Sequence, residues 1–235
     1  AGVTLACHAD SIRDERAGRE AFLELIGRYG APAELTGQLA SMWKAGDHFG
    51  RPLDEVGELR RLAHGETLRA GDLELEVVHT PGHASGHVCY LAREEGLLLC
   101  GDLLLADITP NPLPHFDHEA PRGRQPSLAL YLASLARVES LGPLTGLPGH
   151  GQPLEDTSEA VRVARSHIRD RSEVLFRLIE AHPGADLFEL ARIHFGEPSR
   201  LGQALAFCEV LAHCDLLEDE GRIVVDEERG VPELC

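Results

Sequence analysis

The turn His79-Thr80-Pro81-Gly82-His83 is the first of three places where an apolar run ends at a residue that can bind a metal. The others are Cys100-Gly101-Asp102 and Leu147-Pro148-Gly149-His150-Gly151. Gly and Pro favour tight turns, which can direct a side chain into a shared cleft. Neutral imidazole and carboxylate are ligands of zinc and similar ions. His83, Asp102 and His150 therefore predict a metal site built from three separate turns.

Regular elements are predicted on both sides of these turns. Apolar residues alternate with acidic ones over 72–80, which is typical of a half-buried strand. Short apolar runs at 88–92 and 97–100 flank Glu94-Glu95-Gly96 and predict a hairpin. Helical apolar spacing predicts helices over 19–29 and 128–141, and a brief strand is expected over 144–147. Residues 107–126 contain five Pro and predict a long loop near the metal site.

The pattern changes after Gly151. Asp156-Thr157-Ser158-Glu159 is typical of a helix start, and a long amphipathic helix is expected over 160–181. Shorter helices follow at about 186–195 and 200–214, and residues 216–225 predict a small hairpin. This order of helices and a hairpin is that of a winged-helix module. We therefore predict two domains, 1–155 and 156–235.

Composition and charge restrict the classes of function. The 235 residues carry a net charge of −17, which repels phosphate backbones and disfavours nucleic-acid binding. The chain contains no apolar run of eighteen residues and no pattern of a secretory signal, so we expect no membrane span. Its six Cys form no CxxC pair and are expected to be reduced, as in a cytoplasmic protein.

The three turns and the C-terminal pattern together resemble the metallo-β-lactamase superfamily. They are similar in particular to its branch with a C-terminal winged helix, which includes β-lactamase-like protein 2 and hydroxyacylglutathione-hydrolase-like proteins. The resemblance implies an α/β fold, an αββα sandwich followed by a small winged-helix domain. It also implies that His83 belongs to a first metal site, that Asp102 bridges two ions and that His150 belongs to a second site. One or two zinc ions are implied, with iron or manganese as alternatives.

The segment after His8 departs from the family pattern. Members carry His-x-His-x-Asp-His there, whereas this chain reads His8-Ala9-Asp10-Ser11-Ile12-Arg13-Asp14-Glu15. Aligned on His8, the remaining ligand positions hold Asp10, Ile12 and Arg13; aligned on Ala17-Gly18, the four positions hold Asp10, Ile12, Asp14 and Glu15. His8 stays a candidate ligand. The strands that normally precede this motif are also expected to be missing, so we anticipate an N-terminally incomplete sandwich.

Three functions remain open from the sequence. The first is a metal-dependent hydrolase that cleaves an ester or thioester-type small molecule, with Asp102 as the catalytic residue and His83, Asp102, His150 and His8 as metal ligands. A bound ion would lower the pKa of its water to about 7 and make it a nucleophile. The second is a degenerate, non-catalytic member that serves binding or assembly, including a homodimer. The third, an RNA endonuclease, is disfavoured by the acidic residues of the predicted wing, Glu218, Asp219, Glu220, Asp226, Glu227 and Glu228.

Other residues support weaker predictions. His87 either orients a ligand or is a hydrogen-bonded core residue. Arg122 and Arg124 are candidates to hold an anionic group of the substrate. His115 and His118 either touch substrate or belong to a solvated loop. His79 and His167 are expected to be structural.

Overall fold

The computed structural model describes residues 5–8, 10, 15–45, 59–117, 119–196 and 198–235. The chain groups into two compact units. Unit 1 comprises Ala1–Arg13, Leu53–Pro112 and Ser127–Arg169, and unit 2 comprises Asp14–Pro52, Leu113–Pro126 and Asp170–Cys235. The predicted domain boundary after residue 155 stays a prediction. The two units are defined by contacts between residues, which do not show whether a segment folds on its own.

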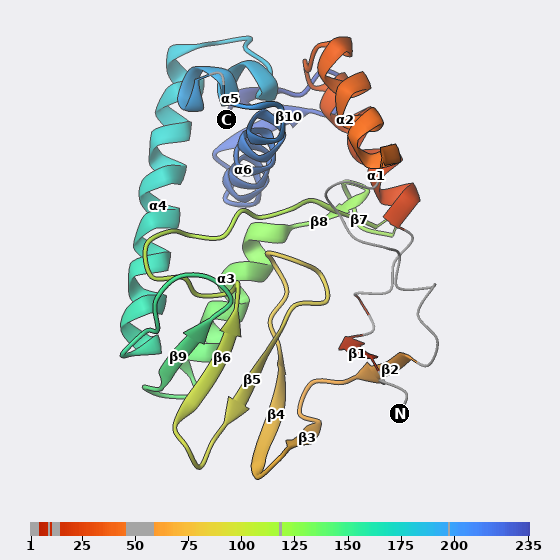
Figure 1. Ribbon diagram of the computed structural model, residues 1–235. Coiled ribbons are helices and arrows are strands. Elements are labelled where there is room, and N and C mark those ends of the chain that lie inside the picture. Colours follow the sequence, from red (N-terminus) through yellow and green to blue (C-terminus); the bar gives the residue numbers. More distant parts are fainter. Residues whose placement is uncertain (1–4, 9, 11–14, 46–58, 118, 197) are drawn as a thin grey trace. The chain divides into compact units, whose positions relative to one another are not determined.

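Unit 1 is built on a five-stranded sheet with the order β3-β4-β5-β6-β9 (Figure 1). Its strands are β3 (Thr67–Ala70), β4 (Leu73–His79), β5 (Val88–Ala92), β6 (Leu97–Gly101) and β9 (Thr145–Pro148). The first four pair antiparallel in sequence order, and β9 pairs parallel to β6. The strands β4, β6 and β9 therefore point the same way, and their C-terminal ends lie at one edge of the sheet.

Alternating burial explains why these segments form strands. In β4, Leu75 and Val77 are buried, while Glu74 is exposed and Glu76 is half-buried. Cys89 and Leu91 in β5 are buried in the same way. The turn between β5 and β6 contains Gly96 with a φ of 64°, which a side chain would disfavour.

Helix α3 (Ser127–Glu139) packs with the turn that follows β4. Leu128, Tyr131, Leu135 and Val138 recur at helical spacing and are buried. The Ser134 hydroxyl donates to the Pro81 carbonyl at 2.7 Å. Unit 1 also contains a parallel pair, β1 (Leu5–His8) with β2 (Leu59–Leu62).

Unit 2 combines helices from both ends of the chain around one apolar core. Its helices are α1 (Glu15–Arg28), α2 (Ala33–Ala45), α5 (Leu187–Phe195) and α6 (Arg200–Asp219), and α4 (Thr157–Ala181) supplies residues to both units. Its strands are β7 (His115–Phe116), β8 (Arg124–Gln125), β10 (Ile223–Asp226) and β11 (Val231–Leu234). Ile26, Tyr29, Leu187 and Phe207 are fully buried in this core.

Two sequence predictions need correction here. The hairpin expected over 216–225 is wrong, because α6 continues to Asp219 and the hairpin consists of β10 and β11. Leu217 and Cys214 lie three residues apart on the buried face of α6, so the helical period persists past 214. The expected loop over 107–126 contains the short pair β7–β8. Residues 113–126 belong to unit 2. Residues 107–112 belong to unit 1, which also contains His83, Asp102 and His150.

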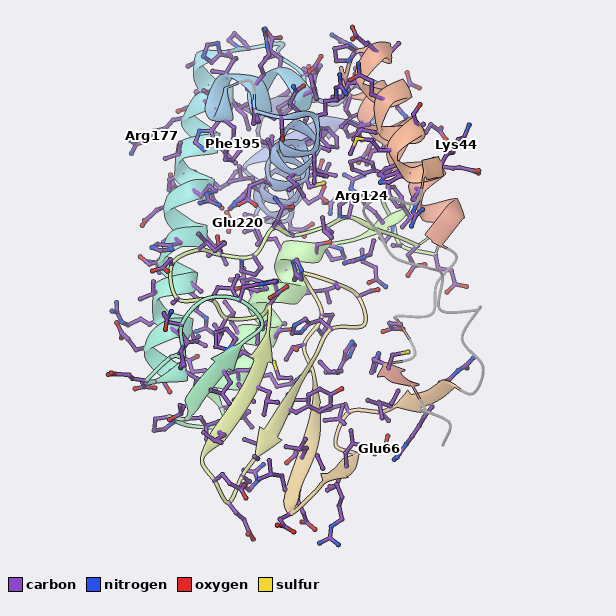
Figure 2. The ribbon with its side chains drawn as sticks, viewed as in Figure 1. Lys44, Glu66, Arg124, Arg177, Phe195 and Glu220 are labelled. Atoms are coloured by element: carbon purple, nitrogen blue, oxygen red, sulfur yellow. The ribbon has the colours of Figure 1, made fainter. Side chains whose placement is uncertain are left out.

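Arg124 has a structural role that differs from the predicted one (Figure 2). Its side chain is 2% exposed and donates two hydrogen bonds to the Asp215 carboxylate, at 2.7 and 3.1 Å. Arg122 donates to Glu218 at 2.8 Å and to Asp219 at 2.7 Å. Burial alone would lower the pKa of Arg124, but the Asp215 charge raises it above its ordinary value. Both Arg residues thus connect the 113–126 segment to α6 instead of being available to hold a substrate anion.

The α/β prediction is confirmed, since helices and sheets are both present. The C-terminal order of helices and hairpin is as expected, and the winged helix itself stays a prediction. Among the described helices, none combines the length and apolar character needed to cross a membrane. The six cysteines, all within the described residues, are free.

Candidate metal centre

Three sequence-predicted ligands meet at the sheet edge where β4, β6 and β9 end. His83 follows β4 by a short turn, Asp102 follows β6 directly, and His150 follows β9. His83 Nε2 lies 3.7 Å from Asp102 Oδ2, and His150 Nε2 lies 3.6 Å from the same oxygen. One carboxylate oxygen is therefore shared by two imidazoles. All three residues belong to unit 1.

The second carboxylate oxygen of Asp102 has an unusual environment. Oδ1 is buried and accepts no hydrogen bond from the described residues. An ionised oxygen without a partner costs free energy on burial, because the water that solvated it is lost. This oxygen therefore needs a cation or a donor that the described residues do not supply.

Two glycines allow the backbone to approach this carboxylate closely. A Cβ atom at Gly149 would lie 2.7 Å from Asp102 Oδ1. At Gly101, φ is 52°, and a Cβ atom would lie 2.6 Å from the ring of His87. Both positions therefore exclude a side chain, which explains why Gly precedes Asp102 and His150 in the sequence.

Asn111 holds His83 in the orientation that a metal ligand requires. The carbonyl oxygen of Asn111 lies 2.8 Å from His83 Nδ1. Since a carbonyl only accepts, Nδ1 carries the proton and donates it, which leaves the lone pair on Nε2. That lone pair is on the nitrogen nearest Asp102. This contact is not predictable from the sequence, because every residue has a backbone carbonyl.

His87 orients the backbone of Asp102. Its Nε2 accepts a hydrogen bond from the Asp102 N–H at 3.1 Å, and its Nδ1 pairs with the Thr80 hydroxyl at 2.8 Å. The acceptor role requires a neutral ring with the proton on Nδ1. Burial first, and then the neighbouring His83, lower the pKa of His87 to about 4. Of the two predicted roles for His87, the geometry favours orientation of a site residue.

This neutral imidazole predicts a specific acid sensitivity of the metal-free protein. The unfolded chain protonates His87 near its ordinary pKa of 6.5, and the folded chain only near 4. Stability is therefore complete above about pH 6.5 and falls as the pH drops towards 4, by roughly 3 kcal/mol in total. Gln can supply an acceptor in the position of Nε2 without titrating. We measure the free energy of unfolding in urea, with EDTA present, between pH 6.5 and 4, and we expect it to depend less on pH in His87→Gln than in wild type. The same pH dependence in both proteins would refute the neutral state assigned to His87.

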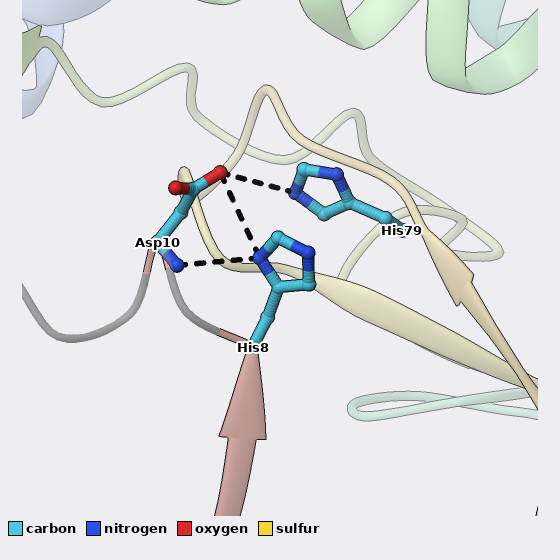
Figure 3. Close-up of side chains that lie close together, drawn as sticks. All are labelled: His8, Asp10 and His79. Carbon is cyan, nitrogen blue, oxygen red and sulfur yellow. Dashed lines mark hydrogen bonds and ion pairs between the residues drawn. The ribbon is translucent and has the colours of Figure 1, made fainter. Parts of the chain in front are cut away.

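His8 lies in a different group, with Asp10 and His79 (Figure 3). The rings of His8 and His79 stack with centroids 3.7 Å apart. Asp10 Oδ2 lies 3.7 Å from His8 Nδ1 and 3.8 Å from His79 Nε2. Within the described residues, no hydrogen bond, ion pair or ring contact joins His8 to His83, Asp102 or His150. The role of His8 as a ligand beside those three stays a prediction.

A hydrogen bond to a backbone carbonyl determines which ring nitrogen of His79 carries the proton. His79 Nε2 lies 2.9 Å from the Ser85 carbonyl oxygen, so this nitrogen carries a proton and has no lone pair to offer. The Ser85 hydroxyl in turn donates to the Asp10 carbonyl at 3.0 Å. The group therefore connects the end of β1 to the turn that carries His83, and the structural role of His79 stays a prediction.

Several predicted residues cannot be compared with the structure. Ile12, Arg13, Asp14 and His118 lie outside the described residues, as does the side chain of Glu15. His115 forms part of β7 in unit 2.

Comparison with known proteins identifies the family. The model of the metallo-beta-lactamase superfamily matches residues 19–150, more than half of the chain. The chain therefore belongs to the metallo-β-lactamase superfamily, whose members generally bind metal ions. The resemblance to the superfamily is thereby confirmed, and the branch with a C-terminal winged helix stays a prediction.

Similar curated proteins include a probable metallo-hydrolase of Bacillus subtilis, 31% identical over 150 residues (63% of this chain, 46% of the relative). A beta-lactamase-like protein 2 homolog of Drosophila melanogaster is 28% identical over 173 residues (72% of this chain, 54% of the relative). An atrochrysone carboxyl ACP thioesterase of Aspergillus fumigatus is 28% identical over 116 residues (48% of this chain, 33% of the relative). The chain spans about half the length of the first two relatives.

Two solved structures share the fold over most of this chain. A metallo-beta-lactamase family protein from Thermus thermophilus has a TM-score of 0.77 at 29% identity, covering 95% of this chain and 69% of that one. A beta-lactamase domain protein from Burkholderia ambifaria has a TM-score of 0.81 at 26% identity, covering 100% of this chain and 67% of that one.

Proposed function

We propose that this chain is a metal-dependent hydrolase that cleaves an ester or thioester of a small molecule at His83, Asp102 and His150. The observation that carries the proposal is the pair of imidazole Nε2 atoms at 3.7 and 3.6 Å from one carboxylate oxygen. A hydrolase also agrees with the names of its relatives, which include a metallo-hydrolase and a thioesterase.

The donor set fits a divalent ion. Two atoms that each lie about 2.1 Å from one ion are at most about 4.2 Å apart. Both His-to-Asp102 separations fall within that limit. Imidazole nitrogen with carboxylate oxygen suits zinc, which we propose as the metal, and it suits iron or manganese as well.

The buried Oδ1 of Asp102 supports a bridging role for this carboxylate. This oxygen is buried and accepts no hydrogen bond from the described residues. A cation beside each oxygen would neutralise the carboxylate and remove the cost of its burial. The fit is thus to one or two ions.

A bound zinc ion supplies the chemistry by lowering the pKa of a coordinated water to about 7. The protein's own residues orient the ligands. His83 is fixed through the Asn111 carbonyl, and the Asp102 backbone is fixed through His87. The His150 side chain is 78% exposed, which leaves one side of the site open to a substrate.

The two alternatives predict different behaviour. A degenerate, non-catalytic member that serves binding or assembly, for example as a homodimer, would retain the fold and hydrolyse no substrate. An RNA endonuclease would have to bring phosphates towards a C-terminal hairpin whose residues include Asp226, Glu227, Glu228 and Glu233. We therefore propose that the winged-helix-like part serves packing or self-association, and that the protein acts in the cytoplasm, in keeping with its six free cysteines.

The test is hydrolysis of a panel of uncharged esters and thioesters, with single-stranded RNA as a further substrate. We expect zinc-dependent thioester or ester hydrolysis that EDTA abolishes and that His83→Ala and His150→Ala each lower at least a hundredfold. His182→Ala, which changes an exposed His of unit 2, is the matched control and should be unaffected. Equal rates in wild type and both site variants would refute the proposal, and so would turnover of RNA alone.

A further inference from the structure

A cavity of about 340 Å³ lies in unit 1, apart from the three ligands. The loop after Asp102, helix α3, the segment after His150 and the first half of α4 line it. The lining side chains that matter here are Leu105, Ile108, Tyr131, Leu154, Ala160 and Val163. Its volume is in the lower part of the range typical of small-molecule sites.

Chain connectivity places this cavity close to the metal centre. Leu105 is three residues after Asp102, and Pro153 is three residues after His150. Three residues of fully extended chain span at most about 11 Å. The two segments that carry the ligands therefore also form two walls of the cavity, so one molecule of modest length can occupy both places.

The wall that α3 contributes is held in place before any ligand binds. The Tyr131 hydroxyl donates to the Leu103 carbonyl at 2.7 Å, so the ring and not the hydroxyl is offered to the cavity. The backbone of Tyr131 also packs against Gly82, where a Cβ atom would lie 2.5 Å from Tyr131 Cα. Tyr131 thus joins the cavity wall to the turn that carries His83.

The lining determines which chemistry the cavity accepts. Most lining residues are apolar, and the described ones include no Lys or Arg. The acidic residues among them are Glu155, Asp156 and Glu159. Glu159 is paired with Arg162, which does not line the cavity, and the carboxylates of Glu155 and Asp156 repel an anion. Ile108, a large apolar residue of the lining, is 65% exposed to water. An apolar ligand would cover it and gain from its burial.

We propose that this cavity receives the acyl group of the substrate and selects an uncharged, apolar one. The inference rests on the proposed hydrolase function and gives it a substrate class. Acyl groups that carry a carboxylate or a phosphate are repelled by acidic side chains of the lining. Among its described residues, this lining holds no Lys or Arg and one imidazole, that of the exposed His167.

Binding of two inert probes tests the cavity without any catalysis. In EDTA, 4-phenylbutanol is titrated against isotope-labelled protein by NMR, and 4-phenylbutyrate is its anionic counterpart. We expect the alcohol to shift amides of 103–109 and 153–164 and to bind about tenfold more tightly than the anion. Ala160→Trp fills the cavity and should weaken the alcohol at least tenfold, whereas Ala136→Trp, on the exposed face of α3, should not. Equal affinity for the two probes, or no effect of Ala160→Trp, would overturn the proposal.

A kinetic comparison connects the cavity to the reaction. With zinc-loaded protein, hexanoyl and succinyl thioesters of N-acetylcysteamine share one leaving group and differ in the charge of the acyl group. We expect at least tenfold higher kcat/KM for the hexanoyl thioester, and a narrower ratio in Glu155→Gln/Glu159→Gln. Probe binding without hydrolysis of any ester would refute the hydrolase function. The preference of the cavity for uncharged, apolar molecules would then still hold. Hydrolysis without the acyl preference would refute the cavity assignment alone.

Discussion

Asp102→Asn is expected to lower zinc-dependent hydrolysis roughly a thousandfold, the equivalent of about 4 kcal/mol of transition-state stabilisation. The substitution preserves size and removes the negative charge that His83 and His150 share. Without that charge, at least one metal equivalent should be lost from the protein. Steady-state kinetics on the preferred thioester, with metal content measured on the same samples, checks this prediction.

The same substitution should have the opposite effect on the stability of the metal-free protein. Asp102 Oδ1 is buried without a partner among the described residues, so a neutral side chain relieves a desolvation cost of about 1–3 kcal/mol. In EDTA at pH 8 we expect Asp102→Asn to unfold at the same temperature as wild type or a few degrees higher. Asp107→Asn, an exposed residue of the same loop, is the control for both measurements. Destabilisation in EDTA together with unchanged hydrolysis would mean that Asp102 is a structural residue.

Arg124→Met is the substitution with the largest expected effect on stability. Arg124 and Asp215 are both buried, and two hydrogen bonds join them. Removing Arg124 takes two hydrogen bonds from the buried Asp215 carboxylate and leaves Arg122, 4.0 Å from its Oδ1, as a cation nearby. We expect a cost of about 3 kcal/mol. For a chain of this size we expect the unfolding temperature of unit 2 to fall by roughly 10 °C. Differential scanning calorimetry measures this shift.

The double variant Arg124→Met/Asp215→Leu separates the cost of the lone charge from the loss of packing. Asp215 is removed together with Arg124, and Glu227, which also pairs with Arg124, is 43% exposed. Because no buried charge loses its partner, we expect the double variant to recover most of the lost stability. Arg229→Ala removes a side chain that is 67% exposed and should change stability by less than about 0.5 kcal/mol. A double variant as unstable as Arg124→Met would show that the charge pair is not the cause.

The sequence was sufficient for the parts of the site that depend on strand direction. Each of the three ligands, His83, Asp102 and His150, follows a strand. These three strands run in the same direction, so their C-terminal ends lie at one edge of the sheet. Alternation in β4 and the Gly residues beside the ligands are local signals, which is why the strands and turns were predictable.

Contacts made by the backbone or across long separations were beyond sequence reasoning. The Asn111 carbonyl that orients His83 has no residue signature. The stacked rings of His8 and His79 belong to residues that are 71 positions apart in the sequence (79 − 8). The assignment of Arg124 to Asp215 likewise depends on how 113–126 packs in unit 2, which neither charge nor spacing encodes.

The proposed hydrolase requires a metal bound by His83, Asp102 and His150. Plasma mass spectrometry on protein purified without chelator measures this most directly. We predict one or two equivalents of zinc, iron or manganese in wild type, reduced in both His83→Ala and His150→Ala and retained in His79→Ala. No metal above background after incubation with excess zinc, or metal that both site variants keep and His79→Ala loses, would contradict it.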